Sequence, residues 1–160
     1  MRTLCLSLLL VLPVTGRAQR PAPARPAFTA AGAFFALSVA DLDVSARWYE
    51  EKLGLTRTMT APRREGAAVV VLEGGGLVVE LVQLDSARAL QRIAPSARGP
   101  QDVHGFFKAG VIVDDFDRAL AELRARGVEI AYGPFPPRAG QRANVIVRDG
   151  AGNLLQLFGR

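Results

Sequence analysis

Val39-Ala40-Asp41-Leu42-Asp43, read as VADLD, returns later in the chain as Val113-Asp114-Asp115-Phe116-Asp117, read as VDDFD. The two copies are 74 positions apart, counted from Asp41 to Asp115 (115 minus 41). Each copy ends an apolar run, opens a helix-like stretch that closes at Gly54 or Gly127, and is followed by strand-like runs. A repeat of this length predicts that one strand-helix-strands module occurs twice.

The order of apolar runs and breakers predicts an α+β fold of two βαβββ modules with a cup between them. Asp41 or Asp43 can accept hydrogen bonds from the first free amides of the first helix. We expect helices at 43–53 and 115–126, and loops at 62–66 and 133–137. The expected strands are 33–39, 55–60, 67–72 and 77–84 in the first module, and 109–113, 128–132, 142–148 and 153–158 in the second.

Length and composition fit one globular domain. The chain has 160 residues, of which 49% are hydrophobic and 22% are charged, and a domain of this size can bury a sizeable core. The formal net charge is +5, but the basic residues are dispersed and no basic run exceeds Arg63-Arg64. Nucleic-acid binding requires clustered phosphate contacts, so we expect no nucleic-acid partner.

The first residues have the pattern of a secretory signal peptide. Met1-Arg2 is positively charged, an apolar run extends from Leu4 to Leu12, and Gly16-Arg17-Ala18 supplies small residues for cleavage. The run is shorter than the roughly 20 residues of a membrane span, although an uncleaved anchor and a misassigned start are alternatives. We therefore predict a signal peptide at 1–18 and an exported protein, in the bacterial periplasm or outside the cell, with no membrane segment after cleavage. Cys5 would leave with the signal, which excludes thiol chemistry in the mature chain.

After the signal we predict a Pro/Ala-rich tether at 19–32 and one domain at 33–160. The domain divides into module 1 at 33–84, a connector at 85–107 and module 2 at 108–160. The long connector is a candidate gate. His104 lies in or near it, and a surface or loop-packing role fits this histidine better than catalysis.

These motifs resemble the vicinal oxygen chelate superfamily, which includes glyoxalase I, extradiol dioxygenases, fosfomycin resistance enzymes and bleomycin resistance proteins. The resemblance covers 34–158, nearly the whole domain. It implies the glyoxalase/bleomycin resistance/dioxygenase-like fold, in which the curved sheets of paired modules enclose a site. The matching segments run from Val39 to Leu55, from Val113 to Val128, and over Asp149-Gly150-Ala151-Gly152-Asn153.

The resemblance also implies where a metal would be bound. Members with metal chemistry take one ligand from the first strand and one from the last strand of each module. The first-strand position, seven residues before the helix-opening aspartate, is Phe34 in module 1 and Lys108 in module 2. The last-strand position, four residues after a turn glycine, is Glu80 or Gln156. Only Glu80 is a ligand-type residue, so we expect neither a divalent metal nor another cofactor.

These four residues, Phe34, Glu80, Lys108 and Gln156, are called the quartet below. They suggest a polar centre that contains no metal. Lys108 could place its ammonium where the ion would lie and bond to Glu80 and the amide oxygen of Gln156, since a buried carboxylate needs a partner. In the alternative, Lys108 lies in solvent at the mouth of the cup and Glu80 bonds elsewhere.

Three functions remain open. The first is metal-free binding of a small, partly apolar ligand, as in the bleomycin resistance branch, with Phe34 as an apolar wall and Glu80, Lys108 and Gln156 as polar contacts. The second is a lyase, isomerase or dioxygenase-like enzyme with an altered metal set or a Lys108/Glu80 acid-base pair, and with no catalytic residue assigned. The third is a dimerising accessory module with a filled cup. A homodimer is possible, and the modules could pair within one chain or by exchange between two.

Overall fold

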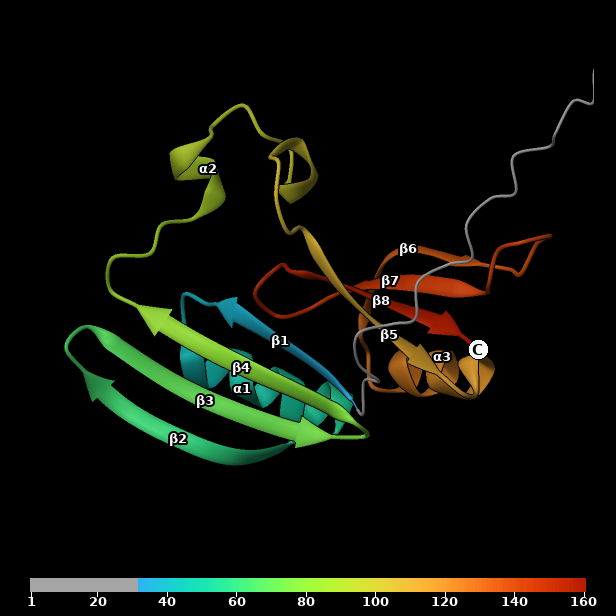
Figure 1. Ribbon diagram of the computed structural model, residues 1–160, viewed down its shortest axis with the longest axis horizontal. Helices are drawn as coiled ribbons and strands as arrows, with labels where there is room; N and C mark the ends of the chain where they lie inside the picture. Colours follow the sequence, from blue (N-terminus) through green and yellow to red (C-terminus); the bar gives the residue numbers. More distant parts are fainter. Residues whose placement is uncertain (1–31) are drawn as a thin grey trace, which may run out of the picture.

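The computed structural model describes residues 32–160, which form two four-stranded sheets with helices on one side of each (Figure 1). The predicted signal peptide at 1–18 and all but the last residue of the predicted tether lie outside the described residues. No helix among residues 32–160 is long and apolar enough to cross a membrane. The elements are β1 (Ala33–Ser38), α1 (Leu42–Trp48), η1 (Tyr49–Leu53), β2 (Thr56–Arg64), β3 (Ala67–Gly74), β4 (Leu77–Leu84), α2 (Leu90–Ile93), η2 (Pro100–Asp102), β5 (Lys108–Val113), α3 (Phe116–Ala125), β6 (Glu129–Phe135), β7 (Asn144–Arg148) and β8 (Leu154–Gly159).

The two sheets have the same topology. Their strand orders are β1-β4-β3-β2 and β5-β8-β7-β6. In each sheet the first strand of the module pairs in parallel with the last, β1 with β4 and β5 with β8, and the remaining pairs are antiparallel. This topology confirms the predicted α+β fold of two βαβββ modules.

The helix-opening aspartates act as N-caps in both modules. The Asp41 carboxylate accepts a hydrogen bond from the Val44 amide at 2.9 Å, and Asp115 accepts one from the Arg118 amide at 3.0 Å. Each bond satisfies one of the amides that a helix start leaves free. The first helix changes at Tyr49 into the π-helical turn η1, which ends at Gly54 with a φ of 72°. That left-handed conformation suits glycine.

Two predicted loop boundaries are wrong, because both edge strands continue through a proline. We expected a loop at 62–66, but β2 runs to Arg64 and only Glu65 and Gly66 turn, with φ values of 50° and 80°. Pro62 is tolerated because an edge strand need not donate from both sides, and the pairing shifts register between Ala61 and Arg64. In module 2 the edge strand β6 likewise extends beyond 132, to Phe135.

One face of each sheet is buried under helices and the other is open. Side chains alternate between faces along a strand, and the residues that face the helices form one hydrophobic core that includes both modules. We call the opposite sides the open faces. The buried positions include Val70, Leu72, Val79 and Leu81 in module 1, and Val145, Val147, Leu155 and Leu157 in module 2.

The modules are joined on the helix side by a buried hydrogen bond. The Tyr49 hydroxyl donates to Asp149 Oδ2 at 2.9 Å, over a sequence separation of 100 residues. Asp149 is only 5% exposed, and it also accepts from the Ala151 amide and from both nitrogens of Asn153. Next to it, a Cβ at Gly150 would lie 3.0 Å from the Trp48 ring. A buried carboxylate with four donors is well satisfied.

A reciprocal contact lies where the two helices end. The Lys52 ammonium donates to the Arg126 carbonyl, and the Arg126 guanidinium donates to the Lys52 carbonyl. The two residues are 74 positions apart, which is the offset of the sequence repeat. The modules are therefore related by an approximate twofold axis through this contact.

The buried Tyr49 phenol predicts a pH-dependent stability. Burial, and secondarily the Asp149 carboxylate, raises the pKa of Tyr49 far above its ordinary value of 10.0. Above pH 10 the unfolded chain loses this proton while the folded chain keeps it, so folding stability should fall by about 1.4 kcal/mol per pH unit from this group. Tyr49→Phe should remove that part of the slope in urea titrations between pH 10 and 12, and should cost about 2 kcal/mol at pH 7.

The control variant is Tyr132→Phe, because Tyr132 is 52% exposed. It should keep the pH slope of the wild type. An equal slope in wild type and Tyr49→Phe would contradict the assignment.

Candidate functional site

The predicted ligand positions of module 1 lie side by side on its open face. In the parallel pair β1/β4, Phe34 is opposite Val78 and Ala36 is opposite Glu80. Phe34 and Glu80 are therefore two positions apart along neighbouring strands and on the same face.

Module 2 has the same arrangement. In the parallel pair β5/β8, Lys108 is opposite Leu154 and Gly110 is opposite Gln156. Lys108 and Gln156 thus occupy the places that Phe34 and Glu80 occupy in module 1. The structure brings the predicted residues together as two equivalent pairs, one on each open face.

The surroundings of these four residues differ. The Phe34 side chain is 63% exposed, whereas Gln156 is 8% exposed and donates from Nε2 to Asn144 Oδ1 at 3.0 Å. Glu80 and Lys108 are half-buried. The Gln156 amide is thus held in a fixed orientation by its neighbour.

The Lys108 ammonium lies away from Glu80 within one chain. It sits 5.2 Å from the centre of the Phe107 ring, a cation-π geometry. The ion pairs among residues 32–160 do not include Lys108 with Glu80. A polar centre made by these two residues would therefore require another arrangement of the modules or a second chain.

The donor set does not fit a divalent transition metal. Of the four positions, Glu80 supplies a carboxylate and Gln156 a neutral amide, while Phe34 cannot coordinate and Lys108 carries a positive charge. Across residues 32–160, the structure contains no group of three His, Cys, Asp or Glu side chains placed to hold an ion. Of the four side chains, only Glu80 is therefore of a type that commonly binds such a metal.

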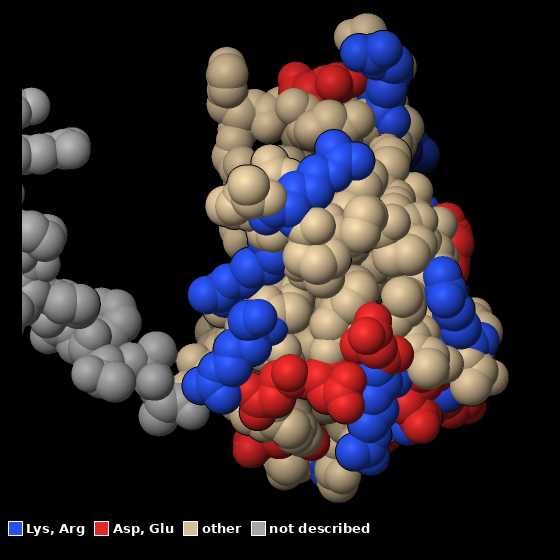
Figure 2. Space-filling view, turned by 90° about the vertical axis from the view of Figure 1, so that its right-hand side faces the viewer, with Lys and Arg blue, Asp and Glu red and all other residues tan. Residues whose placement is uncertain are grey.

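Large apolar side chains are exposed on both open faces and on the connector. On module 1 they include Phe34 and Met59, and on module 2 Ile112 and Tyr132. Figure 2 shows one side of the molecule, with a broad uncharged area bordered by basic and acidic side chains. Within residues 32–160, the further large apolar side chains that are exposed are Leu84 and Phe135 on the open faces, Ile93, Val103, Phe106 and Phe107 on the connector, and Val44 on α1.

His104 and two arginines of module 2 lie at the surface. His104 is an exposed connector residue just before β5. Arg138 and Arg142 are exposed in the connection between β6 and β7. By contrast, sequence reasoning missed the Tyr49–Asp149 bond, because an aromatic residue in a helix usually signals simple packing.

Comparison with known proteins agrees with this architecture. A family model described as Glyoxalase/Bleomycin resistance protein/Dioxygenase superfamily matches residues 33–157. A search of curated proteins found no match.

Solved structures with the same fold share little sequence. A glyoxylase/bleomycin resistance protein/dioxygenase domain from Frankia sp. EAN1pec is 19% identical with a TM-score of 0.63, over 83% of this chain and 93% of that one. TnmS3, an antibiotic binding protein from Streptomyces sp. CB03234, is 20% identical with a TM-score of 0.56, over 84% and 98%. The trypanothione-dependent glyoxalase I of Leishmania major is 22% identical with a TM-score of 0.54, over 79% and 84%.

These structures confirm the fold that the sequence motifs implied. Because the family match spans nearly the whole described domain and the two βαβββ modules are present, the chain belongs to the Glyoxalase/Bleomycin resistance protein/Dioxygenase superfamily, the group known as vicinal oxygen chelate proteins.

Proposed function

We propose that this protein binds a small, partly apolar ligand without a metal ion, in a cup made by the open faces of module 1 of one copy and module 2 of a second copy. The observation that carries the proposal is that exposed apolar side chains share the two open faces with a quartet in which only Glu80 is a usual metal ligand. The predicted signal peptide would place this binding outside the cytoplasm, in the periplasm or beyond the cell.

The exposure of the open faces argues for a second copy. Phe34 and Ile112 are each 63% exposed, although burying one such side chain contributes about 1.5–3 kcal/mol. If the open faces of one chain covered each other, both side chains would be shielded from water. Contiguous exposed apolar surface of this kind commonly marks a binding site or an interface.

The contacts between modules also favour exchange between copies. Within one chain the modules meet through Tyr49–Asp149 and Lys52–Arg126, on the helix side, which leaves the open faces unengaged. β1 and β5 are edge strands of their sheets, and an edge strand keeps backbone groups free for a neighbour. A second copy that sets its β5 beside β1 would bring its module 2 next to module 1.

This arrangement gives the four site residues a joint role. Glu80 would face Lys108 of the partner subunit, and this ion pair would satisfy the carboxylate that lacks one in a single chain. Phe34 would supply the apolar wall, and the Gln156 amide, already oriented by Asn144, would supply a hydrogen bond to polar atoms of the ligand. A mixed wall of this type suits a small organic molecule with both apolar and polar parts.

The first test is the oligomeric state. Sedimentation of the mature chain should give a dimer, and Ile112→Asp should shift it towards the monomer by at least tenfold in dissociation constant, because a carboxylate would be placed in an apolar contact. The matched control is Val44→Asp, since Val44 is 47% exposed on α1, away from the open faces. A wild-type monomer at high micromolar concentration would contradict the exchanged cup.

The second test concerns the metal. Calorimetric titration with Mn²⁺, Ni²⁺ or Zn²⁺ should show no tight, stoichiometric uptake by the wild type. The triple variant Phe34→His, Lys108→His, Gln156→Glu should bind one ion per quartet, because it supplies two imidazoles beside two carboxylates. Tight uptake by the wild type that is lost in Glu80→Ala would overturn the metal-free proposal.

The third test concerns the ligand surface. An apolar fluorescent probe such as anilinonaphthalene sulfonate should bind the wild type, and Phe34→Ala should weaken that binding about tenfold, a loss of about 1.4 kcal/mol. Ile93→Ala removes an apolar side chain that is 69% exposed on the connector, outside the cup, and should leave the affinity unchanged. Equal losses in both variants would contradict the assignment. A thermal-shift screen of small organic molecules can then identify the ligand.

A further inference from the structure

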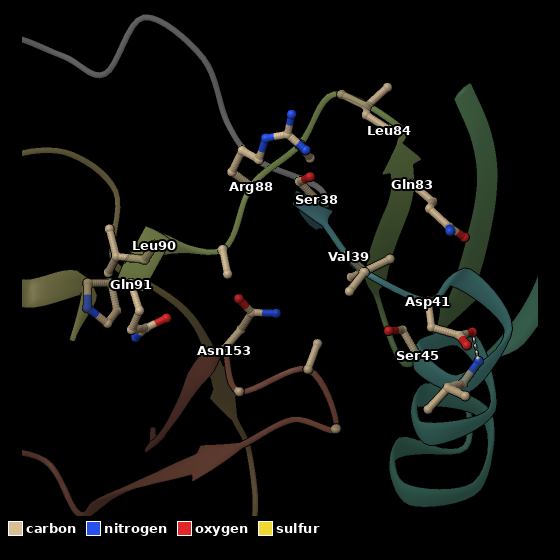
Figure 3. Close-up of a pocket in the computed structure, with 18 of the residues that line it drawn as sticks. Ser38, Val39, Asp41, Ser45, Gln83, Leu84, Arg88, Leu90, Gln91 and Asn153 are labelled. Carbon is tan, nitrogen blue, oxygen red and sulfur yellow. Dashed lines mark hydrogen bonds between the residues drawn. The ribbon is translucent and has the colours of Figure 1, made fainter. Parts of the chain in front are cut away.

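One cavity of the described residues lies away from the four predicted site residues. It is a cleft of about 820 Å³ at the carboxyl ends of β1 and β4, closed on one side by the connector and on another by the turn between β7 and β8. Figure 3 shows Asn153 projecting from that turn between Leu90 and Gln91 of the connector and Val39 of module 1. None of the four predicted site residues lines the cleft.

Among the described residues, two of the three arginines that line the cleft make ion pairs and one does not. Arg98 pairs with Asp102 at 3.5 Å, and Arg148 pairs with Glu129 at 2.9 Å. Arg88, which lies near Ser38 at the rim in Figure 3, makes no ion pair with residues 32–160. Its guanidinium can therefore engage an anion.

The acidic residues of the cleft are already engaged. The Asp41 carboxylate caps α1 through the Val44 amide, and Asp85 pairs with Arg63. Their charge is thus partly balanced by existing partners, and the cleft can admit a small anion beside Arg88.

Two amides of the cleft have a defined orientation. Gln83 Oε1 accepts from the Leu42 amide at 3.1 Å, so the Gln83 NH₂ group is its remaining donor. Asn153 Nδ2 donates to Asp149 at 3.0 Å, so Asn153 Oδ1 is its remaining acceptor. Asn153 Oδ1 can therefore accept a hydrogen bond from a ligand hydroxyl, and the Ser38 hydroxyl can donate one.

We propose that this cleft is a second binding site, for a small hydroxylated carboxylate. The carboxylate group binds the Arg88 guanidinium, which matches it in a bidentate geometry, and a hydroxyl donates to Asn153 Oδ1. The volume of the cleft lies within the roughly 300–1,000 Å³ of small-molecule pockets. A ligand held this way contacts module 1, module 2 and the connector at once.

Arginines of the connector allow ligand binding to be detected as protection of the chain from cleavage. Arg88 and Arg98 line the cleft, whereas the exposed Arg92 between them does not. Bound ligand should shield the chain at Arg88 and Arg98 and leave Arg92 accessible.

The test is limited trypsin digestion of the mature chain, read by mass spectrometry, with citrate as the probe. Citrate should slow cleavage after Arg88 and Arg98 at least fivefold relative to cleavage after Arg92. Tricarballylate has the same three carboxylates without the hydroxyl, so it controls for ionic strength and should protect at least threefold less. Inorganic phosphate should protect less than citrate as well.

Variants complete the test. In calorimetry, Arg88→Gln should weaken citrate binding at least tenfold, and Arg124→Gln, which removes an exposed arginine of α3 outside the cleft, should change it less than twofold. Equal protection at Arg92, equal loss in the two variants, or no binding would overturn the proposal. Tricarballylate or phosphate acting as well as citrate would overturn the assigned ligand class.

Discussion

The buried carboxylate of Asp149 is the constraint on which the rest of the architecture depends. It accepts four hydrogen bonds, three from its own turn and one from the Tyr49 hydroxyl of the other module. A carboxylate at 5% exposure is stable only when it is satisfied in this way. The turn between β7 and β8 is therefore fixed to the end of α1, and the two modules take one relative position through this bond and the Lys52–Arg126 contact.

That position decides which surfaces are left for function. Because the modules join on the helix side, their shared core is closed and their open faces remain free, with Phe34 and Ile112 in water. The same inter-module contact places Asn153, which donates a hydrogen bond to Asp149, at the cleft beside the connector. The inter-module hydrogen bond thus supports both the proposed exchanged cup and the separate polar cleft.

The sequence predicted what depends on local pattern, and missed what depends on distant pairing. The aspartate caps, the terminating Gly54 and the succession of helices and strands along the chain follow from short-range chemistry, and the equal placement of Phe34 and Lys108 follows from the repeat and the family resemblance. The passage of β2 through Pro62 depends on its position at a sheet edge, which the sequence does not encode locally. The Tyr49–Asp149 bond joins residues 100 positions apart. The sequence repeat does not reveal it, because the residue of module 2 that corresponds to Tyr49 is Leu123.

The contrast between the two modules limits what the site can do. A metal centre needs donors from both modules at one point, and this chain has the non-donors Phe34 and Lys108 at two of the four positions although its sheets are intact. Ligand binding has a weaker requirement, because an apolar wall, a carboxylate, an ammonium and an oriented amide can each act on a different part of one molecule. The same backbone positions that would define a metal site therefore define a surface with one apolar side, at module 1, and one cationic side, at module 2. A ligand that matches both sides would carry its apolar part towards Phe34 and its hydrogen-bond acceptors towards Lys108 of the partner subunit.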